Sequence, residues 1–326
     1  MHVVNIRRFA VKGLSGDALA SCELADRDGL PDDRRFALIF QRCVHLLKEN
    51  EWLHKENFGC AFTSGLPLST LRTSYDEETS RLTVYRRGTR KPLLEAKLSD
   101  AQGRDDAGQF FSDVVGEPVL VADGADTHQF GNTSKGVKAS GDLRTVHIVN
   151  AATVRALSAK TGVAIDPLRF RANLIIDGLS AWDEAAWVGR RLRVGRATLR
   201  VIARATRCAG VNLSSEVDGG SSGDDGSLLD VPGLLARDFP EQAPYLGVYA
   251  QVEAGGWVSV GDQVELAPVR VPSKWAAAAR AWLQRVGLGR LAACEDPTVG
   301  VLCAGLVLII AGVHAAGWLL AGGKKS

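Results

Sequence analysis

The sequence predicts a mainly β protein with some α-helix, divided into two β-rich modules and a C-terminal transmembrane helix. Short runs of β-branched and aromatic residues recur along the chain and are separated by turn-forming residues. A polar, glycine-rich segment divides these runs into two sets. Near the end, segment 298–321 contains no Asp, Glu, Lys or Arg. The 326 residues suffice for two ordinary domains ahead of that segment.

The first module covers residues 1–125 and is expected to consist mainly of strands. A hairpin loop is predicted over 75–80, and a helix over 101–115 is followed by a strand over 118–122. The earlier predicted strands lie in the runs VVNIRRFAV, ASCELAD and RRFALIF, and the strand after the hairpin loop lies in RLTVYRR.

A connecting loop over 126–142 leads to the second module, residues 143–269. Its first strand is TVHIV, and Asn150 is expected to cap a helix over 151–160 that ends at Gly162. An acidic Gly/Ser loop is predicted over 216–233. The remaining strands are predicted over 172–176, 191–194, 198–203, 248–252 and 257–266.

The C-terminal part is predicted to attach the chain to a membrane. At about 1.5 Å per residue, the charge-free run extends about 36 Å as a helix, which spans a hydrocarbon core of about 30 Å. We therefore expect a single-pass anchor over 298–322, with Trp318 and two following lysines at the interface. A buried core helix is the alternative. Residues 270–297 are expected to form an amphipathic juxtamembrane helix, or an ordinary docking helix.

Charge around this segment predicts which side of the membrane the modules face. Basic residues precede the anchor, so the positive-inside rule places the modules in the cytoplasm. The mitochondrial outer membrane, the endoplasmic reticulum and a bacterial inner membrane all fit this arrangement. The basic residues are Lys274, Arg280, Arg285 and Arg290.

Composition excludes several kinds of site. The net charge of +2 gives no reason to expect a nucleic-acid surface. The six cysteines are scattered without a CxxC pair and are read as free thiols of a reducing compartment. The sequence contains neither a cysteine cluster for an iron–sulfur centre nor a glycine-rich dinucleotide fingerprint. An oxidoreductase with this sequence would therefore take its electrons from another protein.

Three sets of motifs, in this order, resemble a known family. The first is FAVKGLSG with GLPDDRRFALIF, and the second is LRFRANLIIDG with WDEAAW and VGRRLRVG. The third is ATRCAGVN with YLGVYAQVEAGGWVSVGDQVEL. Together they resemble MOSC domain proteins with an N-terminal MOSC β-barrel domain, similar to the mitochondrial amidoxime-reducing components. The resemblance implies an N-terminal β-barrel module, a MOSC β-barrel domain and a molybdenum cofactor bound between them.

The resemblance also assigns site residues. Cys208 matches the family's thiolate ligand of molybdenum and is therefore the metal-binding and catalytic residue, in agreement with the softness of the metal. Thr206 and Arg207 precede it in the same motif. Basic and amide side chains match the family's cofactor contacts, and a phosphate favours such donors. These residues are Lys12, Arg34, Arg171 and Asn173, with Arg35 as an alternative to Arg34 because DDRR leaves the register open.

Other positions are weaker matches or depart from the family pattern. Asn150 and Thr153 fall where the family presents small polar groups near the cofactor, although helix capping explains Asn150 equally well. Gly13 replaces a serine of the family, and 211–214 replaces its Thr and Asp-Pro turn. One carboxylate of the family's Glu-Asp pair is shifted or missing near Glu184.

The function implied by the resemblance is reduction of small N-hydroxylated compounds by a molybdenum-cofactor oxidoreductase. The expected electron donor is a separate protein, such as a membrane-bound haem protein with its flavin reductase. Two alternatives stay open. One is a carrier that handles the cofactor, or a persulfide on Cys208, and the other is a scaffold that kept the fold without the cofactor.

Overall fold

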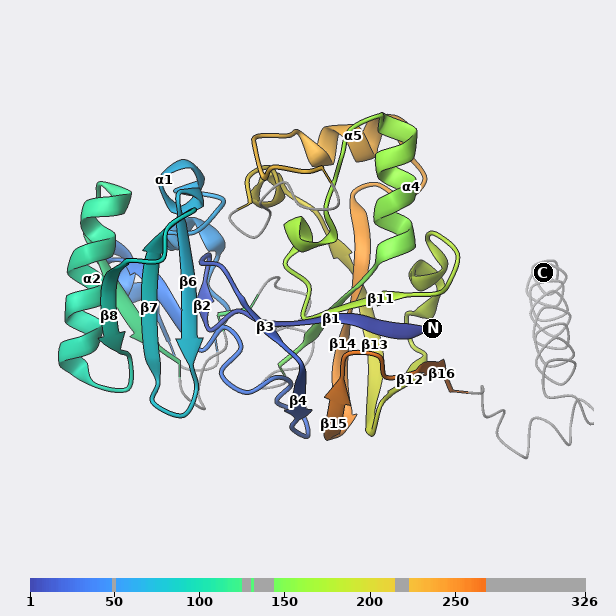
Figure 1. Cartoon of the computed structure of the whole chain (residues 1–326), viewed down its shortest axis with the longest axis horizontal. Helices are drawn as coiled ribbons and strands as arrows, with labels where there is room; N and C mark the ends of the chain where they lie inside the picture. The colour runs from blue at the N-terminus through green and yellow to red at the C-terminus, as the bar shows by residue number, and fades with distance from the viewer. Residues whose placement is uncertain (49–50, 125–129, 132–143, 215–222, 268–326) are drawn as a thin grey trace, which may run out of the picture. The chain divides into compact units, whose positions relative to one another are not determined.

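The larger part of the described structure is an eight-stranded sheet that curls into a half-barrel (Figure 1). The computed structural model describes residues 1–48, 51–124, 130–131, 144–214 and 223–267. One end of the sheet approaches its next-to-last strand, since a β-bridge joins His2 with Gln263 and the Val264 amide donates to the Met1 carbonyl at 2.9 Å. The strands, in sheet order, are β16 (Val264–Leu266), β12 (Arg191–Val194), β13 (Ala197–Thr206), β14 (Tyr245–Ala254), β10 (Val146–Asn150), β11 (Leu174–Asp177), β1 (His2–Arg8) and β3 (Asp17–Leu19).

Strand β10 is buried on both faces. Val146 and Ile148 belong to the core inside the curled sheet, whereas Val149 belongs to a second core beneath helices α4 (Ala151–Thr161) and α5 (Val231–Asp238). Helix α4 begins as predicted, because the Asn150 side chain accepts a hydrogen bond from the Ala152 amide at 3.0 Å.

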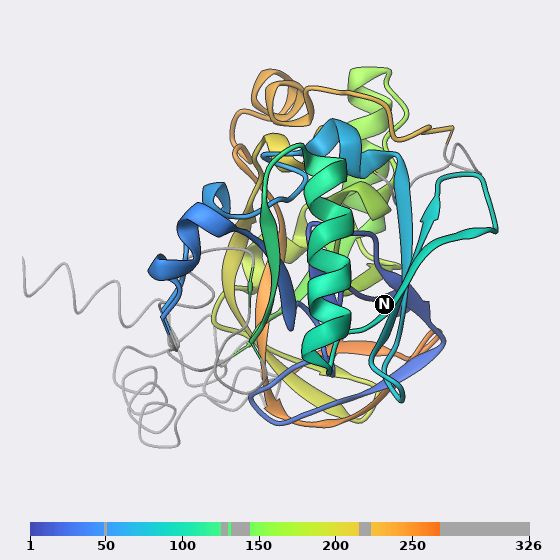
Figure 2. The ribbon, with the colours of Figure 1, turned by 90° about the vertical axis from the view of Figure 1, so that its left-hand side faces the viewer.

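The N-terminal half contains two separate three-stranded sheets around one core. Helix α2 (Ala101–Val115) packs against both sheets, through β8 and β9, and stands in front of them in Figure 2. The prediction was an N-terminal β-barrel-like module, and the described strands of this half form two separate sheets, with β2 ending after two residues where Gly13 turns the backbone to φ +87°. The sheets are β2 (Val11–Lys12), β5 (Phe36–Phe40) and β9 (Val119–Asp123), and the meander β6 (Leu71–Asp76), β7 (Arg81–Arg86) and β8 (Pro92–Lys97).

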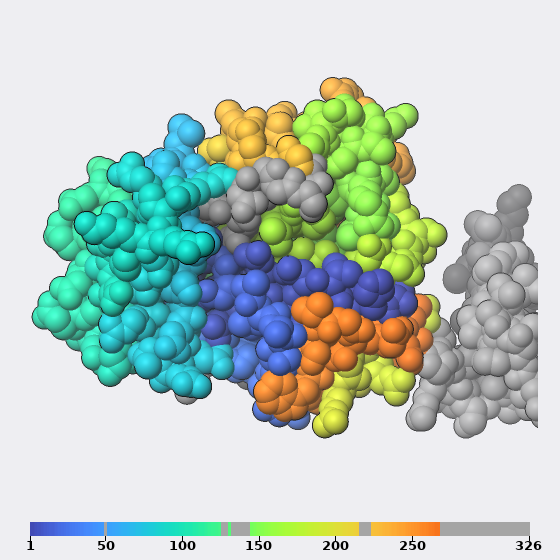
Figure 3. Space-filling view, viewed as in Figure 1, coloured from blue at the N-terminus to red at the C-terminus, as the bar shows by residue number. Residues whose placement is uncertain are grey.

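The first 24 residues tie the two halves together. Strand β1 lies between β11 and β3 in the large sheet, and β4 (Ser21–Leu24) pairs with β15 (Gly256–Ser259). In the space-filling view, this blue segment lies between the cyan N-terminal half and the orange strands (Figure 3). Part of the segment predicted as module 1–125 therefore packs with strands of the second module.

Two predictions near the end of the second module are wrong in detail. The single strand predicted over 257–266 is two strands, β15 and β16, because the chain turns at Gly261 with φ +94°. The loop predicted to end at Gly233 ends earlier, because Asp230 caps α5 by accepting from the Gly233 amide at 3.1 Å. The remaining short helices are η1 (Gln41–Leu46), η2 (Lys55–Asn57), α1 (Gly65–Ser69), η3 (Pro167–Phe170), η4 (Asp183–Trp187) and η5 (Ala209–Val211).

The predicted juxtamembrane helix and anchor lie outside the described residues, as does most of the predicted connecting loop. Among the helices that the structure does describe, none has both the length and the apolar character needed to cross a bilayer.

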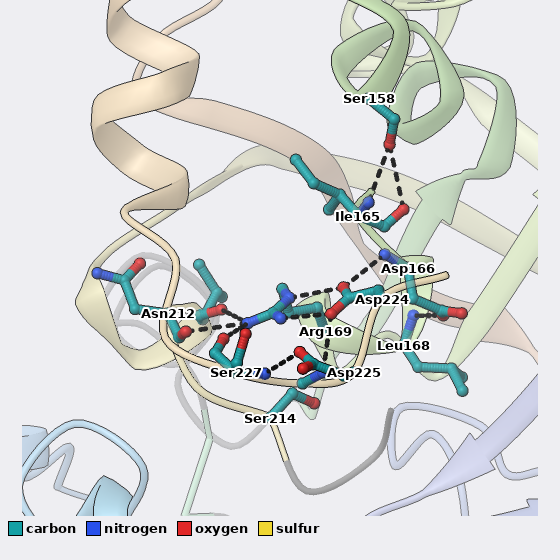
Figure 4. Close-up of polar contacts among 12 residues, drawn as sticks. Ser158, Ile165, Asp166, Leu168, Arg169, Asn212, Ser214, Asp224, Asp225 and Ser227 are labelled. Carbon is teal, nitrogen blue, oxygen red and sulfur yellow. Dashed lines mark hydrogen bonds and ion pairs between the residues drawn. The ribbon is translucent and has the colours of Figure 1, made fainter. Parts of the chain in front are cut away.

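A buried ion pair holds the segment that follows Cys208 (Figure 4). Arg169, in η3, is fully buried, and its Nε and Nη2 donate to the two carboxylate oxygens of Asp224 at 2.8 and 2.5 Å. Its Nη1 donates to the carbonyls of Asn212 at 2.9 Å and Ser227 at 3.0 Å. One guanidinium therefore fastens η3, the end of η5 and the approach to α5 to one another.

The Asp224 carboxylate is charged in this pair. Burial acts to raise its pKa, but hydrogen bonds from Arg169 and from the Asp166 and Gly226 amides outweigh burial and lower the pKa below the ordinary 3.8. A lowered pKa contributes stability that is present above pH 3.8 and is lost as the pH falls through the folded-state pKa.

We expect Asp224→Asn to lower the free energy of unfolding by about 3–5 kcal/mol at pH 7, because it leaves the buried Arg169 charge without its carboxylate. The exposed neighbour Asp225 provides the control, and Asp225→Asn should change stability by less than about 0.5 kcal/mol. Denaturant unfolding measures both values. The difference in free energy of unfolding between wild type and Asp224→Asn should become smaller below pH 4. Equal stabilities of the two proteins at pH 7 would contradict a stabilising role for the Arg169–Asp224 pair.

Candidate functional site

A cavity of about 130 Å³ is lined by residues of the N-terminal half and by residues around the eight-stranded sheet. It is smaller than the roughly 300–1,000 Å³ typical of small-molecule pockets, so it accommodates one end of such a ligand. Its walls come from β2, the segment 55–62, the ends of β10 and β13, and the turn at η3. The lining residues are Lys12, Gly13, Lys55, Cys60, Ala61, Phe62, His147, Phe170, Arg171, Thr206, Arg207, Cys208, Gly210, Val211 and Tyr249.

Cys208 lies where β13 has left the sheet and η5 begins. The thiol is partly exposed and lines the cavity. Gly210 faces it closely, since a Cβ added there would lie 3.6 Å from Cys208 Sγ and 3.8 Å from Phe62 Cβ. The thiol is therefore enclosed by residues from both halves of the described chain.

Lys12 brings positive charge to the opposite wall. Its Nζ donates to the carbonyls of Phe130 and Gly131 at 3.2 and 3.0 Å and lies 5.2 Å from the centre of the Phe58 ring. Burial lowers the pKa of Lys12 to about 8; Cys60 acts in the opposite direction, while nearby cations lower it further. A lysine with a pKa of about 8 is still mainly charged at neutral pH.

The guanidinium groups of Arg34 and Arg171 both lie over the ring of Phe9. Their guanidinium carbons lie 4.8 and 4.3 Å from its centre, and both residues have left-handed backbones with φ near +55°. Such a backbone is uncommon for residues other than glycine. Arg171 lines the cavity, while the buried Arg34 donates to the Arg171 carbonyl at 3.1 Å from behind.

Arg207 is held by a histidine that sequence reasoning missed. Arg207 Nη2 lies 2.6 Å from His147 Nε2, and arginine can only donate, so Nε2 is the acceptor. Burial, with repulsion from Arg207, lowers the pKa of His147 well below 6.5, so the ring is neutral. Its Nδ1 then carries the hydrogen and donates to the Arg171 carbonyl at 3.4 Å. Tyr249 packs on this ring with 5.0 Å between ring centres.

The other predicted site residues lie away from the cavity surface. Asn173 is buried behind it, where its Oδ1 accepts from the His147 amide at 3.0 Å and its Nδ2 donates to the Arg7 carbonyl at 3.1 Å. Arg35 contacts Asp123 at 2.9 Å and Asp32 at 3.0 Å, so Arg34, and not Arg35, approaches the cavity.

Asn150 and Thr153 form a separate buried cluster with Glu184. Asn150 Nδ2 donates to Glu184 Oε2 at 3.0 Å, and Thr153 Oγ1 donates to Glu184 Oε1 at 2.8 Å. Burial raises the pKa of Glu184, although these two hydrogen bonds act in the opposite direction. The structure therefore gathers Lys12, Arg171, Thr206, Arg207 and Cys208 around one cavity, with Arg34 and Asn173 supporting them.

Several residues of this cavity carried no motif signal. Lys55 and Cys60 lie outside the quoted motifs, and only the folded chain places them here, while Tyr249 lies in the third motif set but was not predicted as a site residue. His147 did carry a signal, because a histidine inside the apolar strand TVHIV needs a partner when buried.

A comparison with protein families matches the stretch of chain that contributes His147, Arg171 and Cys208 to this cavity. Residues 135–265 match the MOSC domain family. The chain contains a MOSC domain. MOSC domains occur in proteins that bind the molybdenum cofactor, and the matched residues include His147, Arg171 and Cys208. No curated protein matches the chain.

Solved structures similar to this chain include a YUAD protein and two YiiM proteins. The YUAD protein of Bacillus subtilis is 13% identical, with a TM-score of 0.37, over 81% of this chain and 94% of that one. YiiM from Geobacillus stearothermophilus is 16% identical, with a TM-score of 0.28, over 42% of this chain and 68% of that one. YiiM from Escherichia coli is 22% identical, with a TM-score of 0.28, over 43% of this chain and 61% of that one.

The residues around the cavity fit the chemistry of a molybdenum cofactor. A partly exposed thiol supplies a soft ligand. Lys12, Arg171 and Arg207 supply charge-assisted donors for a phosphate group.

We expect stability to fall as the pH drops below 6.5, because unfolded His147 takes up a proton that the folded ring excludes. The slope from this residue is at most about 1.4 kcal/mol per pH unit. Denaturant unfolding between pH 7 and 5 should show a flatter profile for His147→Gln than for wild type. The exposed His54 is the control, and a His54→Gln profile as flat as that of His147→Gln would contradict the assignment.

Proposed function

We propose that the protein binds the molybdenum cofactor and reduces small N-hydroxylated compounds with electrons from a separate donor protein. The observation that carries this proposal is the Cys208 thiol, which is partly exposed in a cationic cavity of a MOSC domain. When bound, the cofactor would supply a molybdenum centre able to exchange two electrons and an oxygen atom with a substrate.

The residues of the chain would divide the binding between them. Cys208 would ligate the metal as a thiolate. Lys12, Arg171 and Arg207 would neutralise the phosphate, and His147 would orient Arg207 by its 2.6 Å contact. Arg34 and Asn173 would hold the backbone of Arg171 and His147 from behind. None of these supporting contacts needs to form when the ligand arrives, so the site is preorganised.

The reaction balances when a separate protein supplies the electrons. The N–O bond of the substrate breaks, its oxygen leaves as water, and two electrons and two protons are consumed. The donor protein would provide the electrons. Lys12 Nζ, with its pKa of about 8, holds a proton in the cavity at neutral pH.

The test is the molybdenum and pterin content of the purified protein from cofactor-competent cells. We expect about one of each per wild-type chain and loss of metal in Cys208→Ser. Cys43→Ala, which removes a buried thiol remote from the cavity lining, is the matched control and should keep the metal. Turnover of an amidoxime with an artificial electron donor should be observed in the proteins that contain the metal and be absent from those that lose it.

Two outcomes would overturn parts of this proposal. Near-stoichiometric metal in Cys208→Ser would remove Cys208 as the ligand. Wild-type protein without metal would contradict cofactor binding and favour a scaffold, while bound cofactor without turnover of any hydroxylamine or amidoxime would favour a carrier.

We further propose that residues 298–322 anchor the chain in a membrane, with the MOSC domain on the cytoplasmic side. Their lack of charged residues and their length support this proposal. Anchoring would raise the effective concentration of a membrane-bound electron donor.

The full chain should sediment with membranes and resist extraction by alkaline carbonate, whereas residues 1–269 should stay in the supernatant. Release of the full chain by carbonate would contradict an integral anchor.

A further inference from the structure

A second cavity, of about 580 Å³, lies between β3 and β6 and shares no lining residue with the Cys208 cavity. Its size falls within the range of roughly 300–1,000 Å³ that encloses small organic ligands. The walls carry three arginines from three different parts of the chain and one carboxylate. These residues are Arg7, Arg72, Arg87 and Asp17.

Some exposed arginines of the chain are paired with acids, whereas Arg72 and Arg87 have other partners. Arg81, Arg155 and Arg193 each contact a carboxylate, at 3.4, 2.7 and 2.7 Å. Arg87 instead donates to the carbonyls of Ser214 at 3.4 Å and Asp225 at 2.9 Å.

Arg72 lies 5.6 Å from the centre of the Tyr85 ring. Within the part of the chain that the structure describes, neither Arg72 nor Arg87 is paired with an acid. Their positive charge is therefore not neutralised by a neighbouring carboxylate.

The single acid of the cavity already has a partner. Both oxygens of Asp17 accept from the Tyr75 amide at 3.1 Å. Arg7 Nη1 donates to the Gly16 carbonyl at 3.0 Å. Among the described residues, the guanidiniums of Arg72 and Arg87 have no acid partner, so these two side chains give the cavity wall an excess of positive charge.

The floor of the cavity is rigid. Thr73 Oγ1 donates to the Ser15 carbonyl at 2.9 Å, and the Thr73 amide donates to Ser15 Oγ at 2.6 Å. These bonds join the segment before β3 to β6, so the backbone beside Arg72 is held against that segment. A preorganised cationic wall binds an anion with little loss of conformational entropy.

We propose that this cavity is a second anion site and that it binds a small phosphate monoester. A phosphate presents three oxygens, which suits several guanidinium donors at once. The volume exceeds that of inorganic phosphate and leaves room for the organic part of the ester. Arg87 also contacts the segment held by Asp224, so occupancy would act on the chain that follows Cys208.

Isothermal titration calorimetry on the full chain, with adenosine 5′-monophosphate and inorganic phosphate as probes, tests this site. We expect adenosine 5′-monophosphate to bind more tightly than inorganic phosphate or succinate. Arg72→Gln and Arg87→Gln should each weaken binding about tenfold or more, because each removes a charge-assisted donor. Arg72 is exposed, so its substitution leaves the fold intact, which a thermal melt verifies.

Arg86→Gln, next to Arg87 but outside the cavity lining, is the matched control and should bind as wild type does. Failure of the wild type to bind either phosphate probe at millimolar concentration would overturn the proposal, as would equal losses in Arg86→Gln and Arg87→Gln. Tighter binding of succinate would overturn the phosphate assignment. Loss of binding in Lys12→Gln alone would show that the phosphate binds in the Cys208 cavity and would overturn the proposal.

Discussion

The contact on which the candidate site depends is the buried pair of Arg169 and Asp224. Removing two charges from water is costly, so such a pair persists only with full hydrogen bonding. Here the guanidinium reaches two carboxylate oxygens and two carbonyls at 3.0 Å or less. Arg171, two residues after Arg169, lines the Cys208 cavity, and the carbonyl of Asp225, next to Asp224, accepts a hydrogen bond from Arg87 of the second cavity. The pair therefore fixes the distance between elements that sequence alone leaves far apart.

A second constraint is the path of the N-terminal strand. Because β1 lies inside the large sheet, Phe9 emerges from it directly beneath Arg34 and Arg171. The chain then enters β2, which carries Lys12 to the cavity wall. Sheet pairing thus positions residues from the first 34 positions against Cys208, which lies some 170 residues later. The pairing of β1 in that sheet therefore helps to hold the two sides of the Cys208 cavity in place relative to each other.

Sequence reasoning succeeded where the signal was local. Helix α2 begins at Ala101 and ends at Val115 as predicted. Helix α4 begins after its cap at Asn150 and ends before Gly162, also as predicted. It failed where the signal is tertiary. The burial of Arg169 depends on Asp224 from a distant loop, and the choice between Arg34 and Arg35 depended on Asp123 from β9.

The family resemblance predicted the cavity better than it predicted the supporting residues. Lys12, Arg171 and Cys208 do line one cavity, whereas Asn150 and Thr153 belong to the Glu184 cluster. A motif reports residues that contact a ligand, but it does not separate them from residues that hold a helix start. His147 and Tyr249 were missed although the first stands out in the apolar strand TVHIV and the second lies in a quoted motif, because neither signal identifies the side chain that each one contacts.

The same guanidinium chemistry serves two purposes in this chain, and the partner decides which one. Arg169 is matched with a carboxylate, so its charge is neutralised and its contribution is structural. Arg207 is matched with a neutral histidine, and Lys12 with carbonyls, so among the described residues their charge is held in place without being neutralised. Burying these cations raises the free energy of the folded state, and the pKa of Lys12 is lowered mainly by burial and further by the nearby cations. An anion bound among them would offset that cost, which is the physical reason to regard this cavity as a binding site.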